Sequence, residues 1–235
     1  MMGEGTMGWL SDALTQLSVW ALPVLIAVTM HEAAHGFVAS KLGDPTARLL
    51  GRVTLNPIAH IDPIGTILLP LVMLILPGSF LFGYAKPVPI NPMRLGNPRR
   101  DMILVAAAGP GANFLLAFMA AVMVHTVPWM PDWFVTWWAA NLKNAIILNL
   151  MLGVFNLIPL PPLDGGRIVT GILPDTLAFR FARIERYGLM ILIGGIFLVP
   201  YIGSKFGYDL NIFSWLVWGP VEFLFRIVVT LAGLG

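Results

Sequence analysis

Cysteine is absent from this chain of 235 residues. Its absence excludes disulfide scaffolds, thiolate catalysis and zinc sites that are built on cysteine. Charged residues are also scarce, at 11% of the chain, whereas soluble domains carry about 25%. Because 57% of the residues are hydrophobic, the chain lacks the interspersed charges that a soluble surface needs. The composition therefore excludes a disordered tail and a soluble nucleic-acid-binding protein, and a net charge of +2 gives no reason to expect nucleic acid as a partner.

Long apolar runs dominate the sequence, and they lie at residues 14–42, 61–76, 102–127, 133–160, 187–202 and 212–234. A transmembrane helix needs about 20 such residues. The runs therefore predict an all-α polytopic membrane protein with about five or six transmembrane helices. The first ten residues hold no Lys or Arg, so we expect no cleaved signal peptide. No repeat or low-complexity linker divides the chain, and we expect a single domain over residues 1–235, with a core at 14–168 and C-terminal helices at 187–235.

Basic residues cluster in three places, and positive charges favour the cytoplasmic side of a membrane. The clusters comprise Lys41, Arg48 and Arg52; Lys86, Arg94, Arg99 and Arg100; and Arg167, Arg180, Arg183 and Arg186. If all three are cytoplasmic, residues 61–85 begin and end on one side, yet they are too few for two crossings. We therefore expect a re-entrant or short β element near residues 61–92. A full crossing by residues 61–76, against the charge rule, is the alternative.

The first apolar run contains a possible metal site, His31-Glu32-Ala33-Ala34-His35. On a helix, positions i and i+4 share one face, so both imidazoles can bind one metal ion. Glu32 is placed to reach a water molecule on that metal. A structural pair of core histidines is the alternative, but buried ionisable residues are costly in a bilayer. We therefore predict one Zn²⁺ per chain.

A third protein ligand is needed, and the candidates are His60, His125 and Asp164. Asp164 is the best of them, because prolines at positions 159, 161 and 162 break the fourth run just before it. The two glycines that follow, at positions 165 and 166, permit a tight turn. From these residues alone, an ordinary interfacial turn explains the stretch equally well.

Together, these motifs resemble the site-2 protease family of intramembrane zinc metalloproteases, in its compact prokaryotic branch without a PDZ or CBS domain. The resemblance covers about residues 27–168. Beside the two motifs above it rests on residues 43–47 (GDPTA), 51–57 (GRVTLNP), 60–63 (HIDP), 85–92 (AKPVPINP), 108–113 (AGPGAN) and 156–165 (NLIPLPPLDG). It implies that His31, His35 and Asp164 bind zinc and that Glu32 is the catalytic acid and base. It also implies hydrolysis of peptide bonds in or near transmembrane segments, in regulated intramembrane proteolysis.

The resemblance also suggests where a substrate lies. Residues 85–92 match a family element that pairs with the substrate in an extended form, so we expect Lys86 and Val88 to contact it. A plain juxtamembrane loop is the alternative. Asn156 matches the family motif and is expected to hold the substrate or the transition state. His60 is a candidate substrate contact, with a structural role as an equal alternative.

Three further asparagines, Asn113, Asn141 and Asn149, are interpreted as hydrogen-bonding links between helices. Asn141, Asn149 and Asn156 recur at intervals of eight and seven residues, so they lie along one helical stripe. A polar inlet for water along this stripe is the alternative interpretation.

A zinc or ion transporter that uses the same residues as a transit site is the rival hypothesis. Transporters are typically built from internal repeats, and we find none here. We thus expect a transmembrane protein or peptide as substrate and the lipid bilayer as the surrounding medium. The localisation expected is multi-pass in a bacterial or archaeal plasma membrane, with the active site towards the cytoplasm. The sequence does not predict an oligomeric state.

Overall fold

The computed structural model describes residues 4–68 and 85–235, and these residues are helical with no strand among them. The elements are α1 (Glu4–Lys41), α2 (Thr46–Leu49), η1 (Pro57–His60), η2 (Pro63–Leu68), η3 (Pro92–Arg94), α4 (Pro98–Met123), η4 (Val124–Trp129), α5 (Asp132–Asn156), α6 (Asp164–Ile172), α7 (Asp175–Ala182), α8 (Glu185–Ile193), η5 (Gly194–Leu198), α9 (Val199–Lys205), η6 (Ser214–Trp218) and α10 (Gly219–Leu231). The predicted all-α class is confirmed.

Five helical segments are long and apolar enough to cross a bilayer, as predicted for a multi-pass membrane protein. They are Leu14–Lys41, Pro98–Trp129, Asp132–Asn156, Glu185–Lys205 and Ser214–Leu231. The run predicted at residues 61–76 lies partly outside the described residues, and its described part forms the short helix η2. The choice between a crossing and a re-entrant segment there stays a prediction.

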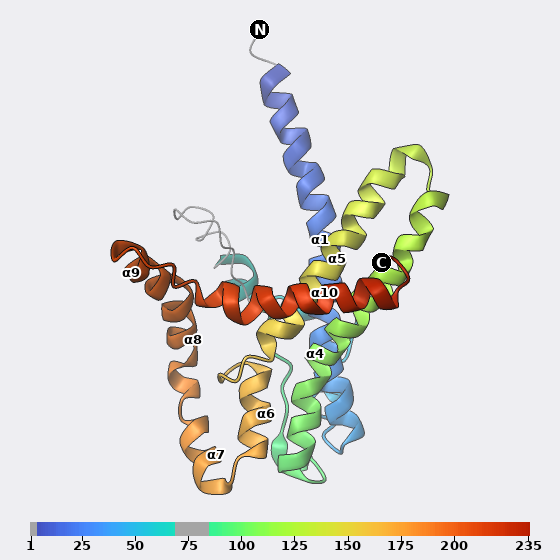
Figure 1. Cartoon of the computed structure of the whole chain (residues 1–235). Coiled ribbons are helices and arrows are strands. Elements are labelled where there is room, and N and C mark those ends of the chain that lie inside the picture. The colour runs from blue at the N-terminus through green and yellow to red at the C-terminus, as the bar shows by residue number, and fades with distance from the viewer. Residues whose placement is uncertain (1–3, 69–84) are drawn as a thin grey trace.

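Helices α1, α4 and α5 pack against one another, and α6 packs on α4 (Figure 1). The start of α4 is fixed by reciprocal capping. The Asn97 side chain accepts a hydrogen bond from the Arg100 N–H, and the Asp101 carboxylate accepts one from the Asn97 N–H. Farther along, the ring of Phe114 in α4 fills the space beside Gly153 in α5, where a Cβ would overlap it. These contacts hold the middle of the three helices together, where the candidate site lies.

The last helix, α10, lies across α4 and α5 rather than alongside them (Figure 1). The run at residues 212–234 was expected to be another membrane-spanning helix, and Ser214–Leu231 is long and apolar enough to cross a bilayer, although α10 runs across its neighbours. The physical reason is that α10 is amphipathic. Val221 and Val228 pack into the core formed with α4 and α5, whereas Glu222 and Arg226 form an exposed ion pair.

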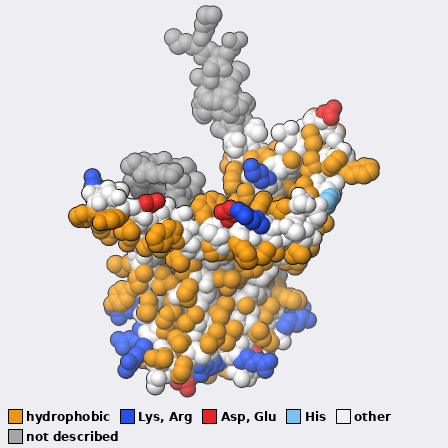
Figure 2. All heavy atoms as spheres, in the orientation of Figure 1, with side chains coloured by type: hydrophobic (Ala, Val, Ile, Leu, Met, Phe, Trp, Pro, Cys, Tyr) orange, Lys and Arg blue, Asp and Glu red, His pale blue; other side chains and the backbone are white. Residues whose placement is uncertain are grey.

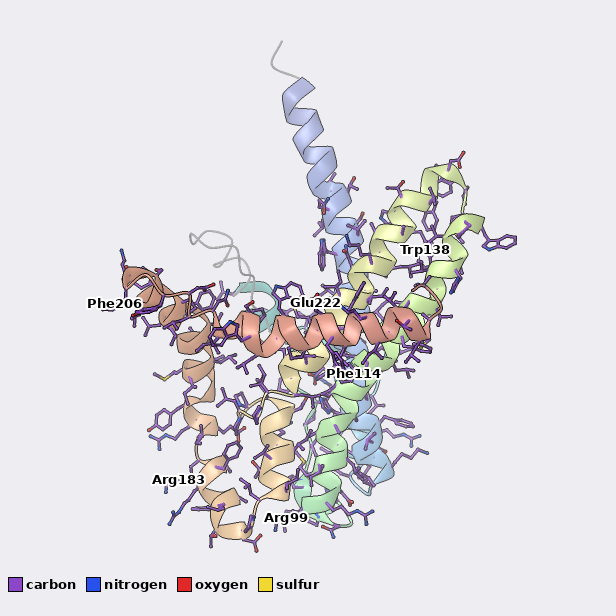
Figure 3. The ribbon with its side chains drawn as sticks, viewed as in Figure 1. Arg99, Phe114, Trp138, Arg183, Phe206 and Glu222 are labelled. Atoms are coloured by element: carbon purple, nitrogen blue, oxygen red, sulfur yellow. The ribbon has the colours of Figure 1, made fainter. Side chains whose placement is uncertain are left out.

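One end of the bundle carries most of the described basic residues. Figure 2 shows Lys and Arg side chains gathered at its lower end, with hydrophobic side chains along the flanks above them. Arg99 and Arg183 lie at that end, and Trp138 lies at the other (Figure 3). The clusters at the starts of α4 and α7–α8 thus share one side, as the charge pattern predicted.

Candidate metal centre

Two imidazoles from α1 form one side of the candidate site. His31 and His35 are buried one helical turn apart, and their Nε2 atoms are 3.1 Å from each other. Their rings meet edge to face, with centroids 4.7 Å apart. The sequence predicted this shared face from the i, i+4 spacing.

The third side chain, Asp164, is delivered by the break after α5. That helix ends at Asn156, and Asp164 opens α6, where the helix dipole favours a carboxylate. The start of α6 fits closely beneath the preceding turn. A Cβ at Gly165 would overlap the carbonyl of Leu157, and a Cβ at Gly166 would overlap Pro161. The two glycines therefore allow the carboxylate to reach α1.

The donor atoms of these three residues meet at one point. Asp164 Oδ2 is 3.2 Å from His31 Nε2 and 3.3 Å from His35 Nε2. Ligand atoms that bind zinc tetrahedrally at 2.0–2.1 Å lie about 3.3 Å apart. Oδ2 is buried and has no hydrogen-bond donor among the described residues. Two imidazole nitrogens and one carboxylate oxygen thus fit a catalytic zinc, with a fourth position left for water or substrate.

Helix α4 forms a close wall behind this point. A Cβ added to Gly109 would lie 2.6 Å from His31 Nε2 and would also overlap His35 Nε2. In the sequence, Gly109 stood out as part of the motif at residues 108–113 (AGPGAN). The structure shows that Gly109 lies against the metal-facing nitrogens themselves. Only knowledge of how α4 crosses α1 could have revealed this.

The other ring nitrogen of each histidine has a hydrogen-bond partner on α4. His31 Nδ1 is 2.6 Å from Asn113 Oδ1, and His35 Nδ1 is 2.7 Å from the carbonyl of Val105. Such partners orient metal-binding imidazoles. Sequence reasoning treated Asn113 only as a link between helices, and its contact with His31 was missed. Gly109 and Asn113 are four residues apart and share one face of α4. This spacing could have indicated that Asn113 faces the same neighbours as Gly109.

Glu32 is half-buried, and its carboxylate accepts a hydrogen bond of 2.9 Å from the Val88 N–H. Val88 belongs to residues 85–91, which run without helical or sheet hydrogen bonding in the described structure. The Asn91 N–H donates to the buried Asp44, and the Arg52 guanidinium donates to the Lys86 carbonyl. This segment, hereafter the extended segment, is thus tied to α1 and to the loop after it.

Asp44 holds one end of the extended segment as an anion. Burial alone would raise the pKa of Asp44. Hydrogen bonds from the Thr46 hydroxyl and from the N–H groups of Asn91 and Thr46, with the nearby charge of Arg94, lower that pKa below its ordinary value. The carboxylate therefore stays charged near neutral pH.

The remaining predicted site residues do not join the metal cluster. His60 is buried, and its Nε2 bonds to the Thr54 carbonyl. Lys86 contributes its backbone, with an N–H that donates to the His60 carbonyl. Asn156 donates to the carbonyl of Leu152 in its own helix. The contacts in the described structure thus neither assign nor exclude a substrate role for these residues.

The chain was also compared with known proteins. The family model of peptidase family M50 matches residues 132–200. YwhC of Bacillus subtilis, which is named as a zinc metalloprotease, is 38% identical over 195 residues, which cover 81% of this chain and 84% of YwhC. Rip2 of Mycobacterium tuberculosis H37Rv, named likewise, is 27% identical over 219 residues, which cover 90% of this chain and 80% of Rip2. A zinc metalloprotease of Methanocaldococcus jannaschii is 27% identical over 150 residues, covering 64% of this chain and 33% of that protein.

No solved structure gives a significant match to this fold. The identity and coverage of YwhC nevertheless decide the family, and the metal cluster agrees with it. The predicted enzyme class and the predicted zinc cofactor are therefore confirmed. The chain belongs to peptidase family M50, the site-2 protease family, and is a multi-pass membrane zinc metalloprotease.

Proposed function

We propose that this protease hydrolyses peptide bonds in or near transmembrane segments of other proteins, inside the bilayer. In this proposal His31, His35 and Asp164 bind the zinc ion, and Glu32 is the general base and acid. The observation that carries it is the meeting of the three donor atoms at 3.1–3.3 Å, with His31 and His35 on a helix that can cross a membrane.

The chain's own residues divide the chemistry between them. Zinc, when bound, polarises the scissile carbonyl and makes water a nucleophile near neutral pH. Glu32 takes the proton of that water and later gives it to the leaving amine. The Val88 N–H, 2.9 Å from the Glu32 carboxylate, holds that base in place. The buried histidines and Asp164 contribute neutral and anionic ligands that leave one coordination position for the reaction.

The extended segment is the proposed place for the substrate. A helical substrate hides its carbonyls in its own hydrogen bonds, so it must unwind before attack. Lys86 and Val88 then offer backbone beside Glu32 along which an unwound chain can lie. A groove of about 570 Å³ continues from Val88 between this segment and α6–α7, and its wall includes Ile90 and Thr170. The groove supports a path for the substrate's chain away from the zinc. Asn156 and His60 remain candidates for substrate contacts.

The proposed location of the active site is the cytoplasmic half of a bacterial or archaeal plasma membrane. Arg99 and Arg183 mark one end of the bundle, and positive charge favours the cytoplasm (Figure 3). Gly109, which touches the site, is eleven residues along α4 from Pro98. That places the site about 16 Å from the charged end. We also propose one domain over residues 1–235, which the packing of α10 on α4 and α5 supports.

The test compares purified wild-type protein with Glu32→Gln, using a model transmembrane peptide in detergent. Gln keeps an oxygen for the Val88 N–H but cannot accept a proton. We expect zinc to be retained and the cleavage rate to fall about 10²- to 10⁴-fold. Glu222→Gln is the matched control, because this exposed glutamate pairs with Arg226 on α10. We expect it to cleave at the wild-type rate.

Two outcomes would contradict the proposal. Cleavage by Glu32→Gln at the wild-type rate would exclude Glu32 as the base. Equal zinc flux through vesicles containing wild type or Glu32→Gln, without cleavage by either, would favour the transporter hypothesis.

A further inference from the structure

A buried chain of hydrogen bonds joins α5, α4 and α1 and ends at His31. Asn149 and Asn113 are both fully buried, and Asn113 Nδ2 donates to Asn149 Oδ1 over 2.8 Å. Asn113 Oδ1 lies 2.6 Å from His31 Nδ1. The two amides thus connect the middle of α5 to a metal-facing imidazole.

The orientation of the Asn113 amide follows from its partners. A carboxamide has two N–H donors on nitrogen and only acceptors on oxygen. Nδ2 faces two carbonyl oxygens, that of Asn149 and, at 3.3 Å, that of Ala27. The reversed amide would set three oxygens against one another. Asn149 is itself oriented, because its Nδ2 donates to the Ala145 carbonyl. The oxygen of Asn113 therefore faces His31.

This orientation decides where His31 carries its proton. Because Asn113 Oδ1 has no proton to give, the hydrogen bond at 2.6 Å requires an N–H at Nδ1. A neutral imidazole has one N–H, so Nε2 keeps its lone pair. Nε2 is the atom that faces His35 and Asp164. The tautomer that zinc needs is thus fixed before any metal binds.

We infer that Asn113 is a positioning residue for the zinc ligand His31, and that Asn149 acts through Asn113 by fixing its amide. The inference rests on the proposed zinc ligands. It extends the site to α5, from which none of the three clustered ligands comes. His35 needs no such side chain, since the Val105 backbone carbonyl accepts its Nδ1–H.

The experiment measures zinc affinity by competition with a chelator in detergent, for Asn113→Leu, Asn149→Leu and Asn141→Leu. We expect Asn113→Leu to bind zinc about 10- to 100-fold more weakly, because the His31 Nδ1–H loses its acceptor. Asn149→Leu should weaken binding by a smaller factor, since the Asn113 amide is then free to turn. Asn141 is the matched control. It is buried on the same helix as Asn149, and within the described part of the chain its amide donates only to the Trp137 carbonyl of that helix. Its variant should bind zinc as the wild type does.

A second measurement reads the tautomer directly. The chain has four histidines, so ¹⁵N-histidine labelling gives a simple spectrum in which protonated and unprotonated ring nitrogens differ. In zinc-free protein we expect His31 to be protonated at Nδ1 in the wild type and in Asn141→Leu. Asn113→Leu should show a mixture of tautomers. If Asn113→Leu does not fold, the same comparison is made with Asn149→Leu.

An unchanged His31 tautomer together with unchanged zinc affinity in both Asn113→Leu and Asn149→Leu would overturn the inference. An equal loss of affinity in all three variants would also overturn it, because the effect would then be one of buried amides in general. Neither readout uses proteolysis, so failure here is distinct from failure of the proposed function, which the Glu32→Gln comparison decides.

Discussion

At the scale of single residues, the space at the metal site depends on a glycine, which has no side chain. Gly109 of α4 lies so close to His31 and His35 that any Cβ would meet their Nε2 atoms. Two positions along the same helix, Gly111 has nothing within 4 Å of a Cβ. The two glycines therefore offer a substitution and its control on opposite faces of one helical turn.

We expect Gly109→Ala to be purified with little or no zinc and to lose cleavage, because the methyl group would occupy the space between the ligand atoms and α4. Gly111→Ala should keep its zinc and melt slightly higher, since Ala is favoured over Gly in a helix by about 1 kcal/mol. Metal analysis per chain and thermal melting in detergent measure both. Full zinc content in Gly109→Ala would show that the helices can separate there at little cost.

Local rules explain which site residues could be predicted. His31 and His35 follow from helical spacing. The prolines before Asp164 made it only the best candidate, and the family resemblance favoured it over an ordinary interfacial turn. Asn113 could be placed on a face of α4 but not against His31. Its partners lie on other helices, and a buried amide can pair equally well with many carbonyls. Contacts between helices depend on crossing geometry that the sequence does not state.

At the scale of elements, the extended segment joins the proposed substrate path to the proposed base. A re-entrant or short β element was expected near residues 61–92, with a plain loop as the alternative for residues 85–92, and residues 85–91 have no sheet partner among the described residues. Its order comes from Glu32 at its middle and Asp44 at its end. Prolines at 87, 89 and 92 keep it from forming a helix.

Val88 lies between Pro87 and Pro89, so a third proline at position 88 can remove the Val88 N–H while the segment stays extended. Val88→Pro suits an extended Pro-x-Pro frame and deletes the donor to Glu32, whereas Val88→Ala shortens the side chain and keeps the donor. We expect kcat of Val88→Pro to lie about tenfold or more below that of Val88→Ala, as for a lost hydrogen bond to a charged group. Zinc content should be the same in both. Equal kcat values would mean that Glu32 does not depend on this contact.

Helix boundaries were largely predictable, and the orientation of α10 was not. The end of α5 follows from the prolines after it. The start of α4 at Pro98, capped by Asn97, lies four residues before the predicted run at 102–127, because hydropathy does not detect a polar first turn. The final apolar run is long enough to cross a bilayer, so its length alone predicts a span. Whether such a helix crosses or lies flat depends on which face packs, and that is decided by α4 and α5.

At the scale of the whole molecule, the direction of α10 determines where the chain ends. Arg183 lies near the basic end of the bundle and Phe206 lies at the level of α10, so α8 and α9 carry the chain away from the basic end to that level (Figure 3). From there α10 lies across the bundle, with Glu222 and Arg226 exposed. Because α10 runs across the bundle, we expect it to begin and end on the same side of the membrane.

Single cysteines can test this arrangement, because the chain has none of its own. We expect Asp209→Cys and Gly235→Cys to react with a membrane-impermeant maleimide from the same side of the membrane. Arg183→Cys should react only from the opposite side. If α10 crosses the bilayer, Asp209→Cys and Gly235→Cys will instead react from opposite sides.

The ligand cluster draws its members from distant parts of the chain, His31 and His35 from the first helix and Asp164 from beyond the fifth. During synthesis the two histidines leave the ribosome long before the aspartate does. A nascent chain halted in α5 would carry two of the three proposed zinc ligands. With these three residues as the proposed zinc ligands, the proteolytic site is complete only after synthesis has passed Asp164.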